Sequence, residues 1–94
     1  MSYEKIDDTL ENWANTRKLP IYKVYKETEV RSFQIVGNKN GCYQLWLDAP
    51  NEKGQVCIHI WDFKKRKKDF FTQEKELFES LETAFHFINK WESE

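Results

Sequence analysis

The chain has 94 residues and a formal net charge of −1, and 39% of its residues are hydrophobic while 33% are charged. This composition excludes an intrinsically disordered chain, and the length predicts a single domain over residues 1–94. The apolar stretches are far shorter than the roughly 20 residues of a membrane-spanning helix, and the N-terminus lacks the basic start and apolar core of a secretory signal. We therefore expect no membrane partner.

The first segment predicts an amphipathic helix over residues 2 to about 15. Ser2 can cap its open backbone N–H groups, and Pro20 requires the helix to have ended by Lys18 or Leu19. Four apolar side chains recur at spacings of three and four and would share one face of this helix: Tyr3, Ile6, Leu10 and Trp13.

Residues 21–63 predict a β-sheet, because the hydrophobic period changes to two and β-branched and aromatic residues dominate. The turns at 38–41 and 51–54 share the pattern Asn-x-x-Gly, which favours a type I turn followed by a glycine in the left-handed region. The break near residues 27–28 has no glycine or proline. Four strands are expected, near residues 21–27, 30–37, 42–48 and 55–63.

A second helix is predicted to begin near Thr72, which would be its N-cap. It carries a wide apolar stripe: Leu77, Phe78, Leu81, Ala84, Phe85, Ile88 and Trp91. The sheet is the large apolar surface on which such a stripe can lie. The expected fold is therefore α+β with the order α-β-β-β-β-α: an N-terminal helix, a four-stranded antiparallel meander and a long C-terminal helix packed on the sheet. The pattern leaves open whether both helices lie on one side.

The predicted sheet has two unlike faces. On one, the turn at 38–41 would bring Phe33 and Ile35 beside Leu45 and Leu47. In the last strand, the alternating β-branched residues at 56, 58 and 60 indicate this same aliphatic face, although the turn at 51–54 predicts the reverse; we follow the β-branched residues. The second face then carries polar and aromatic side chains: Ser32, Gln34, Gln44, Trp46, Cys57, His59, Trp61 and Phe63.

That second face has two interpretations. The N-terminal helix, with its Trp13 and Tyr3, could cover it. Otherwise the face is exposed, and an aromatic patch of this size usually marks a contact surface. A homodimer that buries this face, or that pairs the edge strand at 21–27, is an ordinary solution.

Charge is segregated along the chain. Residues 1–15 contain four acids and one base, and residues 72–94 contain six acids and two bases, whereas residues 16–71 contain 12 bases and six acids. Basic strands and loops therefore lie between two acidic helices, which could present a negative surface to a basic protein partner. Five consecutive bases concentrate the positive charge: Lys64, Lys65, Arg66, Lys67 and Lys68.

Single-stranded nucleic acid is the alternative partner. Proteins that bind single strands combine a basic rim with an aromatic platform. Here the 64–68 run would meet the phosphates, and Trp46 and Trp61 would stack on unpaired bases. The opposing interpretation is that the run is a solvated loop leading into the helix, with its charges offset by nearby acids.

Candidate catalytic and metal-binding residues are few. Cys57 and His59 are same-strand neighbours that would approach each other only loosely, and no Cys/His cluster has the spacing of a zinc site. Cys42 and Cys57 fall at opposite ends of neighbouring strands, which predicts free thiols and a reducing cytoplasm. We predict no enzyme activity, no cofactor and no metal.

Together these patterns predict a small cytoplasmic, non-catalytic binding or regulatory protein whose partner is another protein, a second copy of the chain included. A toxin-neutralising immunity protein is one example of this class. The alternative is a single-stranded nucleic-acid-binding protein. Ten residues are the candidate binding residues: Gln34, Gln44, Trp46, His59, Trp61, Lys64, Lys65, Arg66, Lys67 and Lys68.

Overall fold

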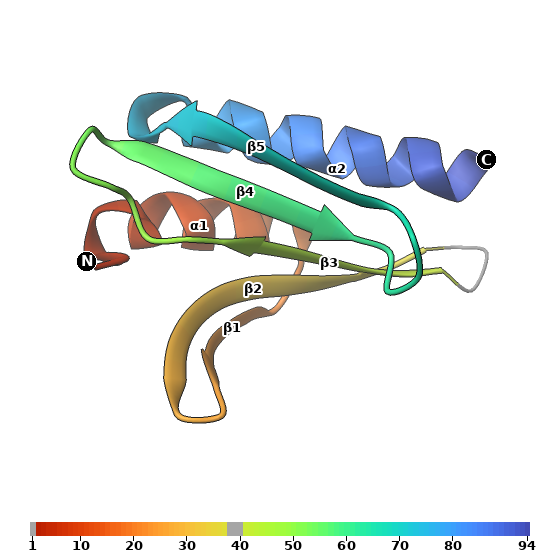
Figure 1. Cartoon of the computed structure of the whole chain (residues 1–94), viewed down its shortest axis with the longest axis horizontal. Helices are drawn as coiled ribbons and strands as arrows, with labels where there is room; N and C mark the ends of the chain where they lie inside the picture. The colour runs from red at the N-terminus through yellow and green to blue at the C-terminus, as the bar shows by residue number, and fades with distance from the viewer. Residues whose placement is uncertain (1, 38–40) are drawn as a thin grey trace.

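Five antiparallel strands form one sheet in the computed structural model, which describes residues 2–37 and 41–94, and two helices pack against that sheet (Figure 1). The elements are α1 (Glu4–Arg17), β1 (Ile21–Tyr25), β2 (Thr28–Val36), β3 (Cys42–Leu47), β4 (Gln55–Trp61), β5 (Lys67–Gln73), a short 3-10 helix (Glu74–Glu76) and α2 (Leu77–Ser93). Sequential strands are neighbours, so β1 and β5 are the two edges. The α+β class and both helices are confirmed, but the sheet has five strands rather than four.

Helix α1 begins and ends close to its predicted limits. The backbone N–H of Glu4 donates to Ser2 Oγ at 3.0 Å, so Ser2 satisfies one open N–H group as predicted, although the N-cap position is taken by Tyr3. The helix continues to Arg17 and ends at Lys18, which adopts the left-handed conformation two residues before Pro20. The Tyr3 hydroxyl donates to the Leu47 carbonyl at 3.0 Å and so ties the start of α1 to the end of β3.

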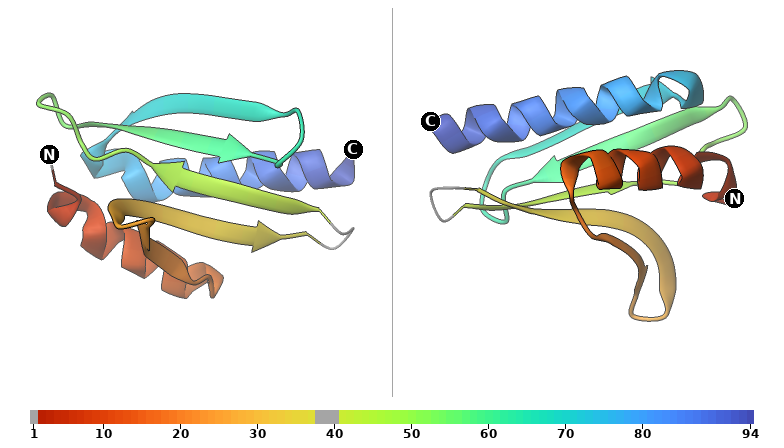
Figure 2. Two further views of the ribbon diagram at one scale, coloured as in Figure 1. Left: turned by 60° about the horizontal axis from the view of Figure 1, so that its bottom comes forward. Right: turned by 180° about the vertical axis from the view of Figure 1, so that it is seen from behind.

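Both helices lie on the same side of the sheet (Figure 2, right). Their apolar stripes and one sheet face form a single hydrophobic cluster, which places the core between the helix layer and the sheet. The buried members of this cluster are Ile6, Leu10, Trp13, Ala14, Phe33, Ile35, Tyr43, Leu45, Leu47, Val56, Ile58, Ile60, Leu77, Leu81, Ala84 and Ile88.

Strand β5 is absent from the predicted elements. Thr72, expected to cap the second helix, lies in this strand, and its hydroxyl hydrogen-bonds that of Ser80 at 2.6 Å. Lys67 and Lys68, expected in a loop, also belong to β5. The strand escaped prediction because its residues show no polar–apolar alternation: Phe70 packs partly against the core, whereas its neighbour Phe71 is exposed. Edge strands often carry charged side chains of this kind.

The hairpin between β2 and β3 has the predicted facing but a different register. Phe33 pairs with Leu45, and Ile35 pairs with Tyr43, so a tyrosine takes the place predicted for Leu47. All of these side chains lie on the core side. The predicted register rested on the turn at 38–41, of which residues 38–40 lie outside the described part of the chain.

The hairpin between β3 and β4 resolves the conflict over the facing of residues 55–61. The turn forms as predicted: Gly54 is left-handed at φ 73°, and the Asn51 N–H donates to the Gln55 carbonyl at 3.0 Å. The Asp48 N–H, however, donates to the Cys57 carbonyl at 3.1 Å, one residue out of step with the Asn51–Gln55 pair. This slip reverses the facing that the turn alone predicts, so the β-branched residues face the core.

Residues Lys26 and Glu27 form the two-residue turn between β1 and β2, with φ angles of 49° and 67°. Two positive φ angles are those of a type I′ turn, which normally uses Asn-Gly because side chains such as Lys and Glu are strained there. The strained turn explains why no turn signal marked this break.

We expect the double change Lys26→Asn with Glu27→Gly to raise the free energy of unfolding by about 1 kcal/mol, because both residues then suit a type I′ turn. Urea unfolding would measure the shift in midpoint. The matched control is Glu52→Gly in the β3–β4 turn, where φ is not positive; it should give no gain. Equal effects of the two changes would contradict the strain argument.

Within the described residues, no helix is long and apolar enough to cross a membrane.

Candidate functional site

The face of the sheet opposite the helices, which we call the open face, is covered by neither α1 nor α2 (Figure 2). The interpretation in which α1 covers it is therefore wrong: Trp13 lies in the core on the other side. Large side chains stay exposed on the open face, including Phe71 on β5, which is 66% exposed. Burying these side chains against a partner would be favourable, so the open face is the first candidate for a contact surface.

The β1–β2 hairpin bends away from the helices (Figure 1). Between this hairpin and β4 the open face has a hollow. This aromatic hollow has a volume of about 460 Å³. Its walls come from four strands and the β4–β5 turn. The lining residues are Tyr25, Val30, Ser32, Gln34, Gln44, Trp46, Trp61 and Phe63. The hollow thus combines four aromatic walls with three neutral polar side chains, a composition suited to a ligand that is largely apolar and uncharged.

Two neighbouring carboxamides line this hollow. Gln34 on β2 and Gln44 on β3 are direct cross-strand partners and lie on the same face. Across residues 2–37 and 41–94, neither carboxamide takes part in a side-chain hydrogen bond, and the indole N–H groups of Trp46 and Trp61 have no acceptor either. Trp13, in contrast, donates its indole N–H to Glu82 Oε2 at 2.8 Å. The hollow therefore offers both donors and acceptors to a bound molecule.

Phe63 enters the hollow from the β4–β5 turn. It adopts φ 64°, which is costly for a bulky side chain, and it is nevertheless 41% exposed. Asp62 holds this turn: its Oδ1 accepts the backbone N–H groups of Lys64 and Arg66 at 2.8 and 3.1 Å. The Phe63 ring lies 4.7 Å from that of Trp61. Strain at an exposed aromatic residue is the pattern of a side chain placed for binding rather than for packing.

The ring of Trp46 is largely engaged within the protein. It stacks on His59 with the ring centroids 4.9 Å apart and the planes 16° from parallel. Lys67 Nζ lies 5.7 Å from the Trp46 ring centroid. Trp46 therefore forms a side wall of the hollow. It is not the free stacking platform for nucleic-acid bases that the sequence had suggested.

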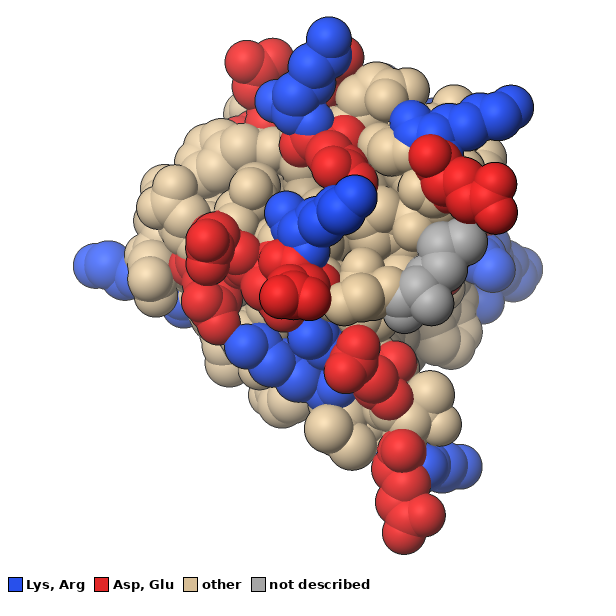
Figure 3. Space-filling view, turned by 90° about the vertical axis from the view of Figure 1, so that its left-hand side faces the viewer, with Lys and Arg blue, Asp and Glu red and all other residues tan. Residues whose placement is uncertain are grey.

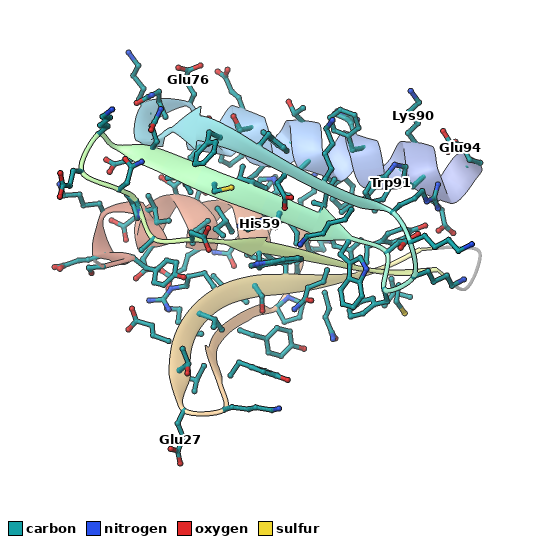
Figure 4. The ribbon with its side chains drawn as sticks, in the orientation of Figure 1. Glu27, His59, Glu76, Lys90, Trp91 and Glu94 are labelled. Carbon is teal, nitrogen blue, oxygen red and sulfur yellow. The ribbon has the colours of Figure 1, made fainter. Side chains whose placement is uncertain are left out.

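The basic run at residues 64–68 does not form one patch. Arg66 Nε donates to Asp62 Oδ2 at 3.1 Å, and Arg66 Nη1 donates to Glu94 at the end of α2 at 3.1 Å. Lys68 lies over the Phe87 ring of α2, 4.5 Å from its centroid, whereas Lys67 is on the open face. Figure 4 places Glu94 and Trp91 at this end of α2. The predicted basic rim is thus divided between the two sides of the sheet, with Lys64 and Lys65 exposed in the turn.

The charge segregation of the sequence becomes a set of ion pairs in the fold. Four pairs join a base from residues 16–71 to an acid of a terminal segment, with N–O distances of 2.7–3.1 Å: Arg17–Glu82, Lys23–Glu11, Arg31–Asp7 and Arg66–Glu94. Figure 3 shows positive and negative groups intermixed on the side that it views. The segregation therefore supports helix docking and is weak support for a strongly charged partner.

A second cluster lies on the open face beside Trp46 and is centred on His59 (Figure 4). His59 Nδ1 lies 2.5 Å from Asp69 Oδ1 across the β4–β5 pair, and His59 Nε2 lies 3.0 Å from Asp48 Oδ2. Cys57, two residues earlier on β4, adds its thiol, and burial raises the pKa of that thiol. A raised pKa is the opposite of what an activated thiolate nucleophile requires.

Five of the ten predicted binding residues line the hollow or stack against its wall, and a sixth, Lys67, lies over the Trp46 ring. Gln34, Gln44, Trp46 and Trp61 line the hollow, and His59 stacks behind Trp46. Sequence reasoning missed Tyr25 and Val30, because the bend of the hairpin has no sequence signal. It also missed Asp48, which directly follows β3, and Asp69 on β5, both of which reach His59. Comparison of the chain with protein-family models, curated proteins and solved structures found no match.

Proposed function

We propose that this chain is a non-catalytic binding protein that recognises another protein through the aromatic hollow of its open face. The observation that carries the proposal is the strained and exposed Phe63 beside Trp61, on a sheet face that neither helix covers. The partner would insert an apolar side chain between these rings. Inhibition of a toxin by direct contact is one form that this function would take.

The chemistry of the hollow favours a polypeptide as the ligand. Gln34 and Gln44 offer neutral donors and acceptors, which suit the N–H and C=O groups of a peptide backbone. The carboxylates of Asp48 and Asp69 lie on the same face and would repel a polyanion such as a nucleic acid. The raised pKa of Cys57 also supports a role in binding rather than in catalysis.

The test is capture and crosslinking of a partner from cells that express the chain. The double change Phe63→Asn with Trp61→Ser should abolish capture, while folding is retained because asparagine tolerates the left-handed conformation. Val24→Ser is the matched control, because Val24 is 67% exposed but does not line the hollow. A photo-crosslinker at Gln44 should label the partner, and one at Glu79 on α2 should not. Labelling from Glu79 alone would contradict the proposal.

A second copy of the chain is one protein partner that this test covers. Sedimentation equilibrium of the pure protein would report it directly. If the chain dimerises through the open face, the Phe63→Asn and Trp61→Ser changes should give a monomer, whereas Val24→Ser should leave the dimer intact.

Single-stranded nucleic acid is the second candidate. The position of Lys67 favours it, because its positively charged side chain lies over the Trp46 ring on the open face. Tryptophan fluorescence during titration with a mixed-sequence oligonucleotide, at low and at moderate salt, distinguishes the two. Quenching that weakens steeply with salt and is lost in Lys67→Gln would favour nucleic acid. A flat titration is the result that we expect for a protein-binding chain.

A further inference from the structure

The side chains around His59 bring together three different metal-ligating atoms. One ligand atom each from Asp48, Cys57 and His59 lies within 4.8 Å of the other two. The backbone holds this arrangement, because the Asp48 N–H donates to the Cys57 carbonyl at 3.1 Å and His59 pairs with Trp46 across the β3–β4 ladder. Cys57 and His59 therefore sit on β4, and Asp48 directly follows β3, where its backbone hydrogen bond holds it beside them; ligands on rigid elements keep their positions well.

We propose that this cluster is a binding site for Zn²⁺, with Cys57 Sγ, His59 Nε2 and an Asp48 carboxylate oxygen as its ligands. A thiolate, an imidazole and a carboxylate are the three kinds of side chain that proteins use to bind Zn²⁺, and the ion would displace the proton of the Cys57 thiol into solvent as it binds. Around a tetrahedral ion such atoms lie about 3.5 Å apart. His59 Nε2 and Asp48 Oδ2, now 3.0 Å apart, would therefore have to separate slightly to admit the ion, and the Cys57 thiol would have to approach from a separation of at most 4.8 Å. Three protein ligands leave a fourth position for water or for an atom of a bound partner.

Asp69 provides the outer support that a metal-bound histidine usually has. Its carboxylate lies 2.5 Å from His59 Nδ1. In the tautomer that carries its proton on Nδ1, Asp69 accepts that N–H and the Nε2 lone pair points toward Asp48. An imidazolium donates to both carboxylates, whereas a neutral imidazole has one N–H and leaves one of them without a donor. A cation between Nε2 and Asp48 would satisfy both of these lone-pair atoms. The arrangement of Asp69, His59 and ion is the carboxylate–histidine–zinc arrangement of known sites.

The surroundings give the site one closed side and one entrance. Cys57 is buried and the His59 side chain is 17% exposed, whereas the Asp48 side chain is 63% exposed and marks the entrance. The Trp46 ring stacks on His59. An ion bound at His59 would therefore change the fluorescence of Trp46, which gives a readout besides the metal itself.

The experiment is a titration of the reduced protein with Co²⁺, followed by displacement with Zn²⁺. We expect one Co²⁺ per chain, with thiolate-to-cobalt charge-transfer absorption that Zn²⁺ abolishes. Cys57→Ser should remove that absorption, and Cys42→Ser should leave it unchanged, since Cys42 is the exposed thiol at the far end of β3. Asp69→Asn should weaken binding about 10- to 100-fold without abolishing it.

Folding does not obscure the result, because Asp48 is exposed and Asp48→Asn should leave the far-UV circular dichroism and urea midpoint unchanged while weakening Co²⁺ binding. His59→Ala should also weaken Co²⁺ binding. His86→Ala on α2 is its matched control and should leave Co²⁺ binding unchanged. The proposal is overturned if wild-type protein shows no charge-transfer band, if the band survives Cys57→Ser, or if it needs Cys42 instead. Partner capture through the hollow is measured separately, so failure of the metal site leaves the proposed function standing.

Discussion

Replacing Trp13 by alanine is expected to lower the free energy of unfolding by about 3–5 kcal/mol, a large part of the total for a domain of this size. Trp13, on α1, has no solvent exposure, and its ring contacts both the sheet and α2. Its ring meets Phe33 of β2 edge-on at 5.1 Å and Phe85 of α2 at 6.2 Å. Its indole N–H donates to Glu82, and this hydrogen bond lowers the pKa of the Glu82 carboxyl. Alanine removes both the packing and the hydrogen bond.

Two further variants separate these contributions, with urea unfolding as the measurement. Trp13→Phe keeps an aromatic ring but loses the donor to Glu82, and we expect it to cost about 1.5–3 kcal/mol. Trp61→Ala removes a tryptophan of the open face and should cost at most about 1 kcal/mol, because the ring is partly exposed and outside the core. If Trp61→Ala proved as costly as Trp13→Ala, the open face would be structural rather than a contact surface.

The core was predictable from sequence because periodicity reports directly which side chains are buried together. The stripe of α2 and the alternation of β2 and β3 predicted the buried residues without knowledge of the strand pairing. In β4, the β-branched residues outweighed the turn, and the one-residue slip between Asp48 and Asn51 explains why the turn misled. Strand β5 escaped because Lys67 and Lys68 resemble a loop when their strand neighbours are unknown.

The candidate site was predictable only in part, since it depends on contacts between strands. Alternation placed Gln34, Gln44, Trp46 and Trp61 on one face, and the hollow contains all four. The bend of the β1–β2 hairpin and the cross-strand reach of Asp69 to His59 have no counterpart in local sequence. Charge segregation, the clearest sequence signal, corresponds in part to ion pairs between segments, such as Arg17–Glu82 and Arg66–Glu94.

One of those ion pairs, Arg31–Asp7, lies at the edge of the hydrophobic core. Arg31 is a buried base on β2 whose Nε and Nη2 donate to the two oxygens of Asp7 at 2.7 and 3.1 Å. Its Nη1 donates to the Val30 carbonyl at 2.7 Å, and its guanidinium lies over the Tyr3 ring at 4.5 Å. This bidentate pair therefore fixes α1 against the sheet. The hydrogen bond that Asp7 accepts from Arg31 lowers the pKa of the Asp7 carboxyl.

We expect Arg31→Met to cost about 2–4 kcal/mol at pH 7, because it leaves Asp7 without its partner at a partly buried position. Lys23→Met is the matched control: it breaks the exposed pair with Glu11 and should cost no more than about 1 kcal/mol. Urea unfolding at pH 7 would measure both.

The effect of Arg31→Met should also depend on pH, in a direction that the lowered pKa of Asp7 determines. In the acidic range between that lowered pKa and the ordinary value near 3.8, the unfolded chain binds more protons than the folded protein, so stability rises with pH. The contribution of the pair is complete above the ordinary value and is lost as pH falls through the lowered one. The wild-type and Arg31→Met proteins should therefore differ less at pH 3 than at pH 7. An equal difference at both values would mean that Arg31 acts through its packing on Tyr3 rather than through its charge.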